Sequence, residues 1–501
     1  MIRKRQFFGA AGVDIITTPL FVILNIIIIP IYFNFINNNE YGLWLFILEI
    51  ISLGNLFNSG IHLYAIQMFS ERNQLGEAYF RKSLSTLFIF QILVIFFIII
   101  LLFISYNILP FFEQIKINEN YNLIFYLMIL NLIITSFYSF FTYIMQAQNK
   151  LIRNNIINSI QKFLYQILPL FFLYYGMNLF AFPISYIITG LLILISIIYY
   201  FQNFLNFLNF QNFSINILKK IFIFCSSIMV GGTGYFVINF TDTVIIANFL
   251  NASAVTIYVM TMKMSLLLRF LIARFLSLSF TTFTQILSEG NFKRLQELSR
   301  KFFRFSVRGG TFFFVLIINL NQIFVINWVG YDKYGGEYLS LISALICMRE
   351  SIYPVFSNII YATKDVKYIN NIQFVEAILN ICLSILMVNI FGITGVALAT
   401  LISFSFFSLI YSIHKSSKII KIKMSLYFKD LVKIIILSFP SYVVIYFSTN
   451  ILVYNFSWFN IINALILACI TNIIFFEGII IFKIKKIDNI KNIINFIIKH
   501  S

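Results

Sequence analysis

The segment IYVMTMKMSLLLRFLIARF, residues 257–275, is apolar enough to lie inside a lipid bilayer, yet it carries Lys263, Arg269 and Arg274. A cation at the centre of a membrane-spanning helix costs about 3 kcal/mol on insertion scales. Three such residues on one predicted helix indicate that the helix faces more than lipid hydrocarbon. It faces either a water-filled cavity or a set of acidic partners.

The composition of the whole chain predicts an all-α integral membrane protein. Of its 501 residues, 60% are hydrophobic and only 11% are charged, whereas a soluble domain carries about 25% charged residues. The net charge of +18 would suggest nucleic acid in a soluble protein, but in a membrane protein it marks cytoplasmic loops. We therefore expect no nucleic-acid partner. The four cysteines are widely spaced in apolar runs, so we expect no metal site.

Apolar runs recur along the chain and predict about fourteen transmembrane helices. The predicted spans are 15–36, 42–66, 83–106, 121–145, 155–175, 179–201, 217–248, 254–286, 306–328, 338–361, 368–390, 392–413, 430–450 and 458–482. Most of the 36 basic residues fall in every second connecting segment. This alternation predicts a multi-pass protein with both termini in the cytoplasm.

Two short matches indicate an internal repeat. The words NFIN at 34–37 and NFLN at 248–251 are 214 residues apart, and the same offset pairs Glu49 with Lys263. Gly176 and Gly392 match at an offset of 216. Two matches at nearly one offset predict two parallel copies of six helices, and repeat-built transporters place their sites at the repeat interface. The predicted parts are an N-lobe at 1–202, a C-lobe at 214–415, two extra helices at 426–484 and a cytoplasmic tail at 485–501.

Two stretches resemble the polysaccharide flippase branch of the multidrug/oligosaccharidyl-lipid/polysaccharide exporter superfamily. They are EYGLWLFILEIISLGNLFNSGIHLYAIQMFSE at 40–71 and FGITGVALATLIS at 391–403. The resemblance implies two six-helix lobes around a central cavity that opens to alternate sides. It also implies that undecaprenyl-pyrophosphate-linked oligosaccharide units are flipped to the outer leaflet of the bacterial inner (plasma) membrane, for O-antigen or capsule synthesis. The partners expected from it are this lipid-linked substrate, membrane lipids, and a polysaccharide polymerase with its chain-length regulator.

The pyrophosphate of such a substrate gives the intramembrane cations a role. Buried cations that line a cavity would offset the desolvation of a dianion. We therefore predict Lys263, Arg269, Arg274 and Arg349 as substrate-binding residues. Lys263 and Arg274 share a helix face, and Arg269 lies roughly 120° away from it. The alternatives are that Arg274 snorkels to the membrane boundary and that Arg349 forms a structural salt bridge.

Five further ionisable residues are candidates for charge pairs or for ion coupling: Glu49, Asp242, Glu350, Glu376 and His62. Glu49 either faces Lys263 across the cavity or forms a structural pair, and Asp242 either pairs with Lys263 or binds a coupling proton. Glu350 stands beside Arg349 as its natural partner. His62 is either a hydrogen-bonded interior histidine or a proton relay. We expect no cofactor, and the sequence leaves open whether a proton or sodium drives the transport.

Other functions fit parts of this pattern. A drug exporter of the same superfamily would favour acidic cavity residues, and a peptidoglycan-precursor flippase would share the cationic cavity. A membrane-embedded polymerase would need a sizeable outer loop, and the predicted outer loops are short. The chain lacks a G-x-x-x-x-G-K-[ST] motif, so it contains no P-loop ATPase. We therefore expect a transporter and not an enzyme.

Overall fold

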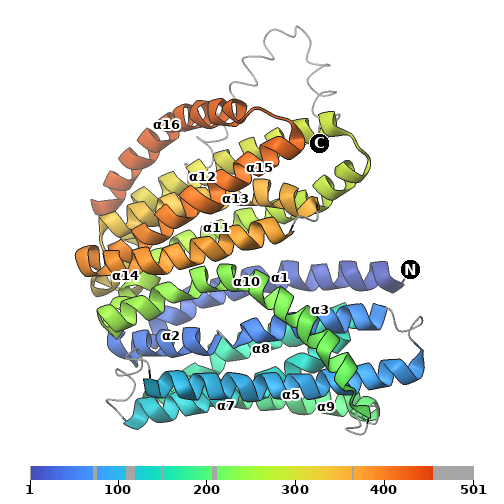
Figure 1. The fold of residues 1–501 in the computed structure, drawn as a ribbon. Helices are drawn as coiled ribbons and strands as arrows, with labels where there is room; N and C mark the ends of the chain where they lie inside the picture. Colours follow the sequence, from blue (N-terminus) through green and yellow to red (C-terminus); the bar gives the residue numbers. More distant parts are fainter. Residues whose placement is uncertain are drawn as a thin grey trace. The chain divides into compact units, whose positions relative to one another are not determined.

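The structure is a computed structural model that describes residues 2–52, 54–70, 76–108, 119–148, 150–205, 212–363 and 366–454. This part of the chain is built of helices joined by short turns (Figure 1). The helices are α1 (Ile2–Tyr32), α2 (Asn38–Ser52), α3 (Asn55–Ser70), α5 (Glu77–Ile108), α7 (Glu119–Ala147), α8 (Leu151–Tyr174), α9 (Ala181–Leu205), α10 (Ile215–Phe249), α11 (Ala252–Ser288), α12 (Phe292–Val329), α13 (Glu337–Ala362), α14 (Val366–Phe404), α15 (Ile410–Ile420) and α16 (Met424–Tyr454). Every predicted span that begins before residue 455 falls on these helices, and the span at 458–482 lies outside the described residues.

The surfaces of these helices are those of a membrane protein. Among the described residues, eight helical stretches are long and apolar enough to cross a bilayer. Large apolar side chains stand on the outside of the helices, such as Phe96 at 62% exposure and Ile195 at 63%. A soluble protein rarely leaves such contiguous apolar surface uncovered, and helices satisfy their own backbone groups in lipid. The predicted all-α membrane fold is confirmed, while the count of fourteen spans stays a prediction.

The second predicted span, 42–66, is wrong as a single helix. The helix α2 ends at Ser52 and α3 begins at Asn55. Between them the N–H of Gly54 donates to the carbonyl of Ile51 at 3.1 Å, and a Cβ on Gly54 would lie 2.6 Å from the Cδ1 atom of Leu132 on α7. The glycine therefore lets the Leu132 side chain of α7 pack directly against this bend.

The repeated words of the sequence mark repeated local structures. The side chain of Asn37 accepts from the N–H of Glu40 at 2.9 Å at the start of α2, and Asn251 accepts from the N–H of Ala254 at 2.8 Å at the start of α11. Both asparagines are therefore N-caps. Gly176 and Gly392 also share a left-handed backbone, with φ of 80° and 59°.

The glycine of the YGLW word lies at a close helix contact. A Cβ on Gly42 would lie 1.7 Å from the carbonyl oxygen of Ala252, the first residue of α11. The hydroxyl of Thr256 donates to the carbonyl of Asn38 at 2.7 Å beside this contact. Any side chain at position 42 would therefore force the start of α11 away from α2.

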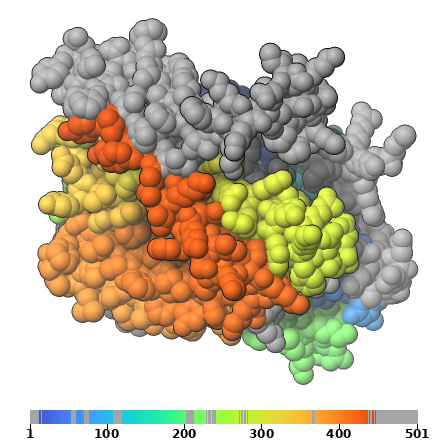
Figure 2. Space-filling model, turned by 90° about the horizontal axis from the view of Figure 1, so that it is seen from above, coloured from blue at the N-terminus to red at the C-terminus, as the bar shows by residue number. Residues whose placement is uncertain are grey.

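The chain divides into two compact units, each with its own apolar core. The first unit comprises Met1–Val259 and Gln373–Thr400, and the second comprises Met260–Ile372 and the described residues after Thr400. Within the first unit α5, α7 and α9 run side by side (Figure 1), and within the second α12 packs on α13 and α16. Figure 2 shows α15 and α16, orange to red, adjoining on the surface of the second unit.

These units are groups of packed helices, and they do not test the predicted lobes, 1–202 and 214–415. The helix α10 was predicted to open the C-lobe, but it packs on α2, α3 and α5 in the first unit. The contact is close because Gly60 of α3 has no side chain: a Cβ there would lie 2.7 Å from the Cα of Cys225. The arrangement as two parallel six-helix lobes stays a prediction.

Candidate functional site

Two of the four predicted substrate-binding cations lie half-buried on α11, in the second unit. They are Lys263 and Arg269. Neither makes a hydrogen bond or an ion pair with another described residue of the second unit. Arg269 is close enough to the thiol of Cys347 on α13 to act on it electrostatically. Because unpaired cations in lipid are costly, this geometry favours the interpretation that they face water or an anion.

The other two predicted cations differ from this pair. Arg274 also lies on α11, but its side chain lies outside the described part. Arg349 on α13 is buried, with 6% exposure, and forms an ion pair with Glu350. Its guanidinium donates to the carbonyl of Phe404 at 3.4 Å and lies 4.1 Å from the centre of that ring. These contacts support the structural alternative for Arg349, whose role in substrate binding stays a prediction.

The carboxylate of Asp242 is the centre of a buried polar cluster in the first unit. It accepts from the hydroxyl of Tyr258 at 2.7 Å and from the hydroxyl of Thr400 at 3.1 Å. The amide of Asn380 donates to the Thr400 hydroxyl at 3.0 Å. We call these four residues the Asp242 cluster; they come from α10, α11 and α14, in which Asn380 precedes and Thr400 follows a kink at Gly392. Such a set of carboxylate, hydroxyl and amide oxygens suits a proton or a small hard cation.

Two further predicted acids lie near this cluster. Glu49, half-buried on α2, is close enough to Asp242 for the two carboxylates to interact electrostatically, and it also accepts from the hydroxyl of Ser52. Glu376 is fully buried and lies one helical turn before Asn380, on the same face of α14. The structure thus brings Glu49 and Asp242 together, and it leaves their roles as predictions.

His62 is held by its neighbours on α7. Its Nε2 atom lies 2.7 Å from the amide oxygen of Gln146, to which it donates, and its ring packs on Tyr143 with 4.6 Å between the ring centres. These contacts favour a hydrogen-bonded interior histidine over a proton relay.

Sequence reasoning missed Tyr258, Asn380 and Thr400. A usable signal existed for Asn380, because it lies four residues after the predicted Glu376 in an otherwise apolar run, and this spacing places both on one helix face. Tyr258 and Thr400 gave no such signal, since each is a single polar group among apolar neighbours. Only the packing of α10, α11 and α14 brings their hydroxyl groups to Asp242.

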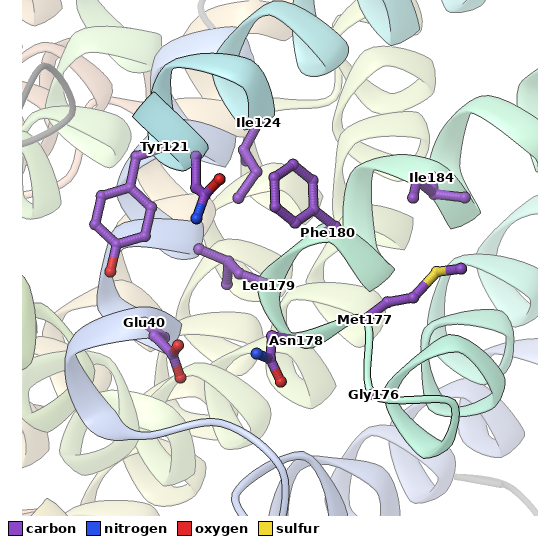
Figure 3. A pocket seen from close by; sticks show the side chains of 10 residues that line it. Glu40, Tyr121, Ile124, Gly176, Met177, Asn178, Leu179, Phe180 and Ile184 are labelled. Carbon is purple, nitrogen blue, oxygen red and sulfur yellow. The ribbon is translucent and has the colours of Figure 1, made fainter. Parts of the chain in front are cut away.

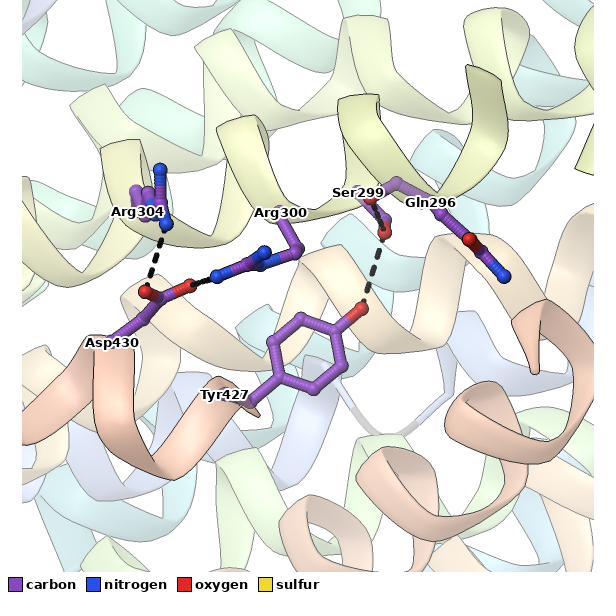
Figure 4. A network of polar contacts seen from close by, with 6 residues as sticks. All are labelled: Gln296, Ser299, Arg300, Arg304, Tyr427 and Asp430. Atoms are coloured by element: carbon purple, nitrogen blue, oxygen red, sulfur yellow. Dashed lines mark hydrogen bonds and ion pairs between the residues drawn. The ribbon is translucent and has the colours of Figure 1, made fainter. Parts of the chain in front are cut away.

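A polar network fixes α16 to α12 in the second unit (Figure 4). Asp430 accepts from Arg300 and from Arg304, each at 2.9 Å, and the hydroxyls of Tyr427 and Ser299 lie 3.1 Å apart. The apolar run of α16 starts after Lys433, so Asp430 lies outside it, although the span predicted at 430–450 begins at this residue. Burial raises the pKa of Asp430, but the hydrogen bonds and charges of Arg304 and Arg300 outweigh it and hold this pKa below its ordinary value.

We expect Asp430→Asn to lower the thermal stability of the purified protein by a few degrees. The substitution removes the charge that two guanidinium groups share, which is worth about 1 to 2 kcal/mol for partly exposed partners. Because the pKa of Asp430 is depressed in the folded protein, its contribution is present above about pH 4 and is lost as the pH falls further. The stability difference between the two proteins should therefore shrink in acid. A difference that stays constant down to pH 3 would exclude this origin.

The comparisons with known proteins agree on one fold. A family model described as "Polysaccharide biosynthesis protein" matches residues 34–308, and no curated sequence matches the chain. The chain is similar to a solved structure of the lipid II flippase MurJ in an inward closed conformation, with 18% identity, a TM-score of 0.70, and coverage of 95% of this chain and 99% of that one. It is also similar to an inward-facing multidrug resistance MATE family transporter of the MOP superfamily, with 11% identity, a TM-score of 0.58, and coverage of 80% and 99%. The all-helical membrane fold expected from the sequence resemblance is confirmed, and its division into two six-helix lobes stays a prediction.

Proposed function

We propose a function from the family of this chain, which belongs to the polysaccharide biosynthesis protein family. The protein flips undecaprenyl-pyrophosphate-linked oligosaccharide units from the inner to the outer leaflet of the bacterial plasma membrane. The units serve the synthesis of O-antigen or capsule. The protein acts by alternating access and catalyses no reaction. Its fold, shared with solved transporters and a flippase, supports the proposal.

The half-buried cations of α11 carry the proposal. Lys263 and Arg269 lie on α11 within the apolar segment 257–275, and neither forms an ion pair with another described residue of the second unit. A pyrophosphate dianion would be stabilised by charge-assisted hydrogen bonds from an ammonium and a guanidinium. The polyprenyl tail can stay in lipid while the head group crosses. A substrate that binds the two access states differently would then shift their populations.

The distribution of basic residues supports an orientation for the first unit. The helix ends at the turns from α3 to α5, from α7 to α8 and from α9 to α10 carry Arg81, Lys82, Lys150, Arg153, Lys219 and Lys220. Positive charge is enriched in cytoplasmic segments, so we assign this end of the helices, and both chain termini, to the cytoplasm. Membrane lipids and, outside, a polymerase with a chain-length regulator are the proposed partners.

The Asp242 cluster is the proposed site of the coupling ion. A buried carboxylate that is held by hydroxyl groups can exchange a proton, or can accept sodium together with the oxygens of Thr400 and Asn380. Either ion would remove the negative charge of Asp242 from the protein interior. The binding of the ion would in this way bias one access state over the other.

A lipid II flippase is the second candidate function. Its substrate carries the same polyprenyl pyrophosphate, so the same cations would serve it, and the fold likeness to the lipid II flippase MurJ gives this candidate its support. The two functions differ in the group that the lipid carries and in the pathway that consumes the product.

Complementation in two bacterial strains separates these functions. In a strain that lacks its own repeat-unit flippase, we expect the protein to restore surface polysaccharide, measured as cell-surface glycan at matched protein levels. In a strain depleted of its lipid II flippase, we expect no rescue of growth. Rescue of growth without surface polysaccharide would assign the protein to peptidoglycan synthesis and overturn the proposal. Because repeat units differ among strains, hosts with several repeat-unit structures are used.

A further inference from the structure

A pocket of about 440 Å³ lies at one end of the first unit, and the functional site described above does not use it (Figure 3). It is lined by ten residues from the starts of α2, α7 and α9 and from the segment Gly176–Phe180 that joins α8 to α9. Its volume falls in the range of about 300 to 1,000 Å³ that is typical of small-molecule sites.

The polar groups of the pocket gather at one side of it. Figure 3 shows the carboxylate of Glu40 and the amide of Asn178 pointing toward each other, with the ring of Tyr121 on the same side as Glu40. The phenol of Tyr121 is close enough to Glu40 for the two groups to interact electrostatically. One oxygen of Glu40 accepts from the N–H of Asn37 at 3.0 Å, so the other oxygen is left for a ligand.

The backbone holds Asn178 in an uncommon conformation. Its φ is +45°, in the left-handed region that residues other than glycine seldom adopt. The preceding Gly176 is also left-handed, with φ of 80°. Local strain of this kind collects where a side chain must be aimed, and here the amide of Asn178 is aimed into the pocket.

The chemistry of the lining suits a sugar without charge. Ile124, Leu179 and Phe180 form an apolar floor, and Tyr121 adds an aromatic ring that packs well against the C–H face of a ring. A carboxylate and amides offer acceptors and donors for hydroxyl groups. Glu40 is the one charged residue among the ten that line the pocket, so an anionic sugar or a phosphate would be repelled.

The position of the pocket agrees with a role outside the cell. It lies where α1 and α8 end and where α2, α7 and α9 begin. The basic residues of the same unit lie at the opposite helix ends, which the proposed orientation puts in the cytoplasm. The pocket therefore opens toward the side on which the flipped glycan emerges.

We propose that this pocket is a glycan subsite that binds an uncharged sugar residue on the outer side of the membrane. The inference rests on the proposed function for its orientation and for its role in transport. The sugar belongs either to the lipid-linked unit that is leaving the protein or to the finished polymer. Binding at this subsite would hold the glycan clear of the helix ends while the lipid tail returns to the outer leaflet.

The test measures sugar binding directly, without transport. The full-length protein in lipid nanodiscs is studied by saturation-transfer NMR with methyl glycosides of neutral hexoses and N-acetylhexosamines, and with methyl glucuronide as the anionic probe. We expect neutral glycosides to receive saturation and the glucuronide to receive none. Asn178→Gly should weaken neutral binding about tenfold, because glycine keeps the left-handed backbone and removes only the amide.

Matched variants make the assignment specific. Tyr174→Ala removes an exposed tyrosine that does not line the pocket, and it should bind like the wild type, whereas Tyr121→Ala should lose binding. Glu40→Gln keeps the helix cap, since glutamine serves a capping box as well, and it should admit the glucuronide. Equal binding by the wild type and Asn178→Gly, or no binding of any neutral glycoside, overturns the inference.

Competition identifies the source of the sugar. Displacement of the bound glycoside by the lipid-linked unit alone assigns the subsite to the transported substrate, and displacement by free polymer alone assigns it to the product. Displacement by neither contradicts the inference. Because glycoside binding does not depend on flipping, a protein that binds sugar but fails to restore polysaccharide contradicts only the proposed function. A protein that restores polysaccharide but binds no sugar contradicts only the subsite.

Discussion

Lys263→Gln should reduce surface polysaccharide about 30-fold in a strain without its own flippase, while the protein stays in the membrane at the wild-type level. The substitution removes the charge of a half-buried side chain on α11 and keeps most of its length. A charge-assisted hydrogen bond to an anion is worth about 2 kcal/mol, which corresponds to about a 30-fold change in binding. The stability of the second unit should not suffer, since Lys263 has no hydrogen bond or ion pair to lose among the described residues of that unit.

A matched lysine serves as the control for this prediction. Lys162 on α8 also lies within a predicted span, but it is exposed and its ammonium sits 5.9 Å from the centre of the Phe21 ring. Lys162→Gln should therefore leave polysaccharide production unchanged. Arg269→Lys tests how Arg269 binds the substrate. Retained activity indicates that a positive charge is sufficient, and lost activity indicates that the guanidinium makes two hydrogen bonds to phosphate. If the double variant Lys263→Gln, Arg269→Gln produced as much surface polysaccharide as the wild type, it would exclude a mechanism in which these two cations bind the substrate.

Local sequence signals predicted those parts of the fold that local physics determines. Apolar runs placed the helices because lipid demands about twenty apolar residues per span. The words NFIN and NFLN proved informative since their last residues, Asn37 and Asn251, both cap helices. The pair of glycines at 176 and 392 matched because both positions require a left-handed backbone.

Features that arise from packing between distant segments could not be predicted from the sequence. At the break between α2 and α3, Gly54 packs against Leu132 of α7, a contact that no local pattern indicates. The membership of α10 in the first unit depends on a close approach between Gly60 and Cys225. Arg349 carried the same intramembrane-cation signal as Lys263, but its contact with Phe404 was not encoded by any local pattern.

Asp242→Asn should reduce surface polysaccharide at least tenfold and should abolish the response of the protein to its coupling ion. Asparagine has nearly the same shape and can still accept from Tyr258 and Thr400, so the cluster should stay folded. It has no charge and takes up no proton, so ion binding should lose its driving force. The measurement is the melting temperature of the purified protein across sodium concentrations and pH values, because a ligand that binds the folded state raises it.

Thr400 offers the control that separates ion binding from packing. Thr400→Ser keeps the hydroxyl that donates to Asp242 and accepts from Asn380, so it should retain the ion response, whereas the similarly shaped Thr400→Val should weaken it. The alternative, in which Asp242 pairs with Lys263, makes a different prediction: the double variant Asp242→Asn, Lys263→Gln would then be no worse than either single variant. Independent roles in coupling and in substrate binding require the two losses to add. Wild-type transport by Asp242→Asn would reduce the Asp242 cluster to a structural contact between α10, α11 and α14.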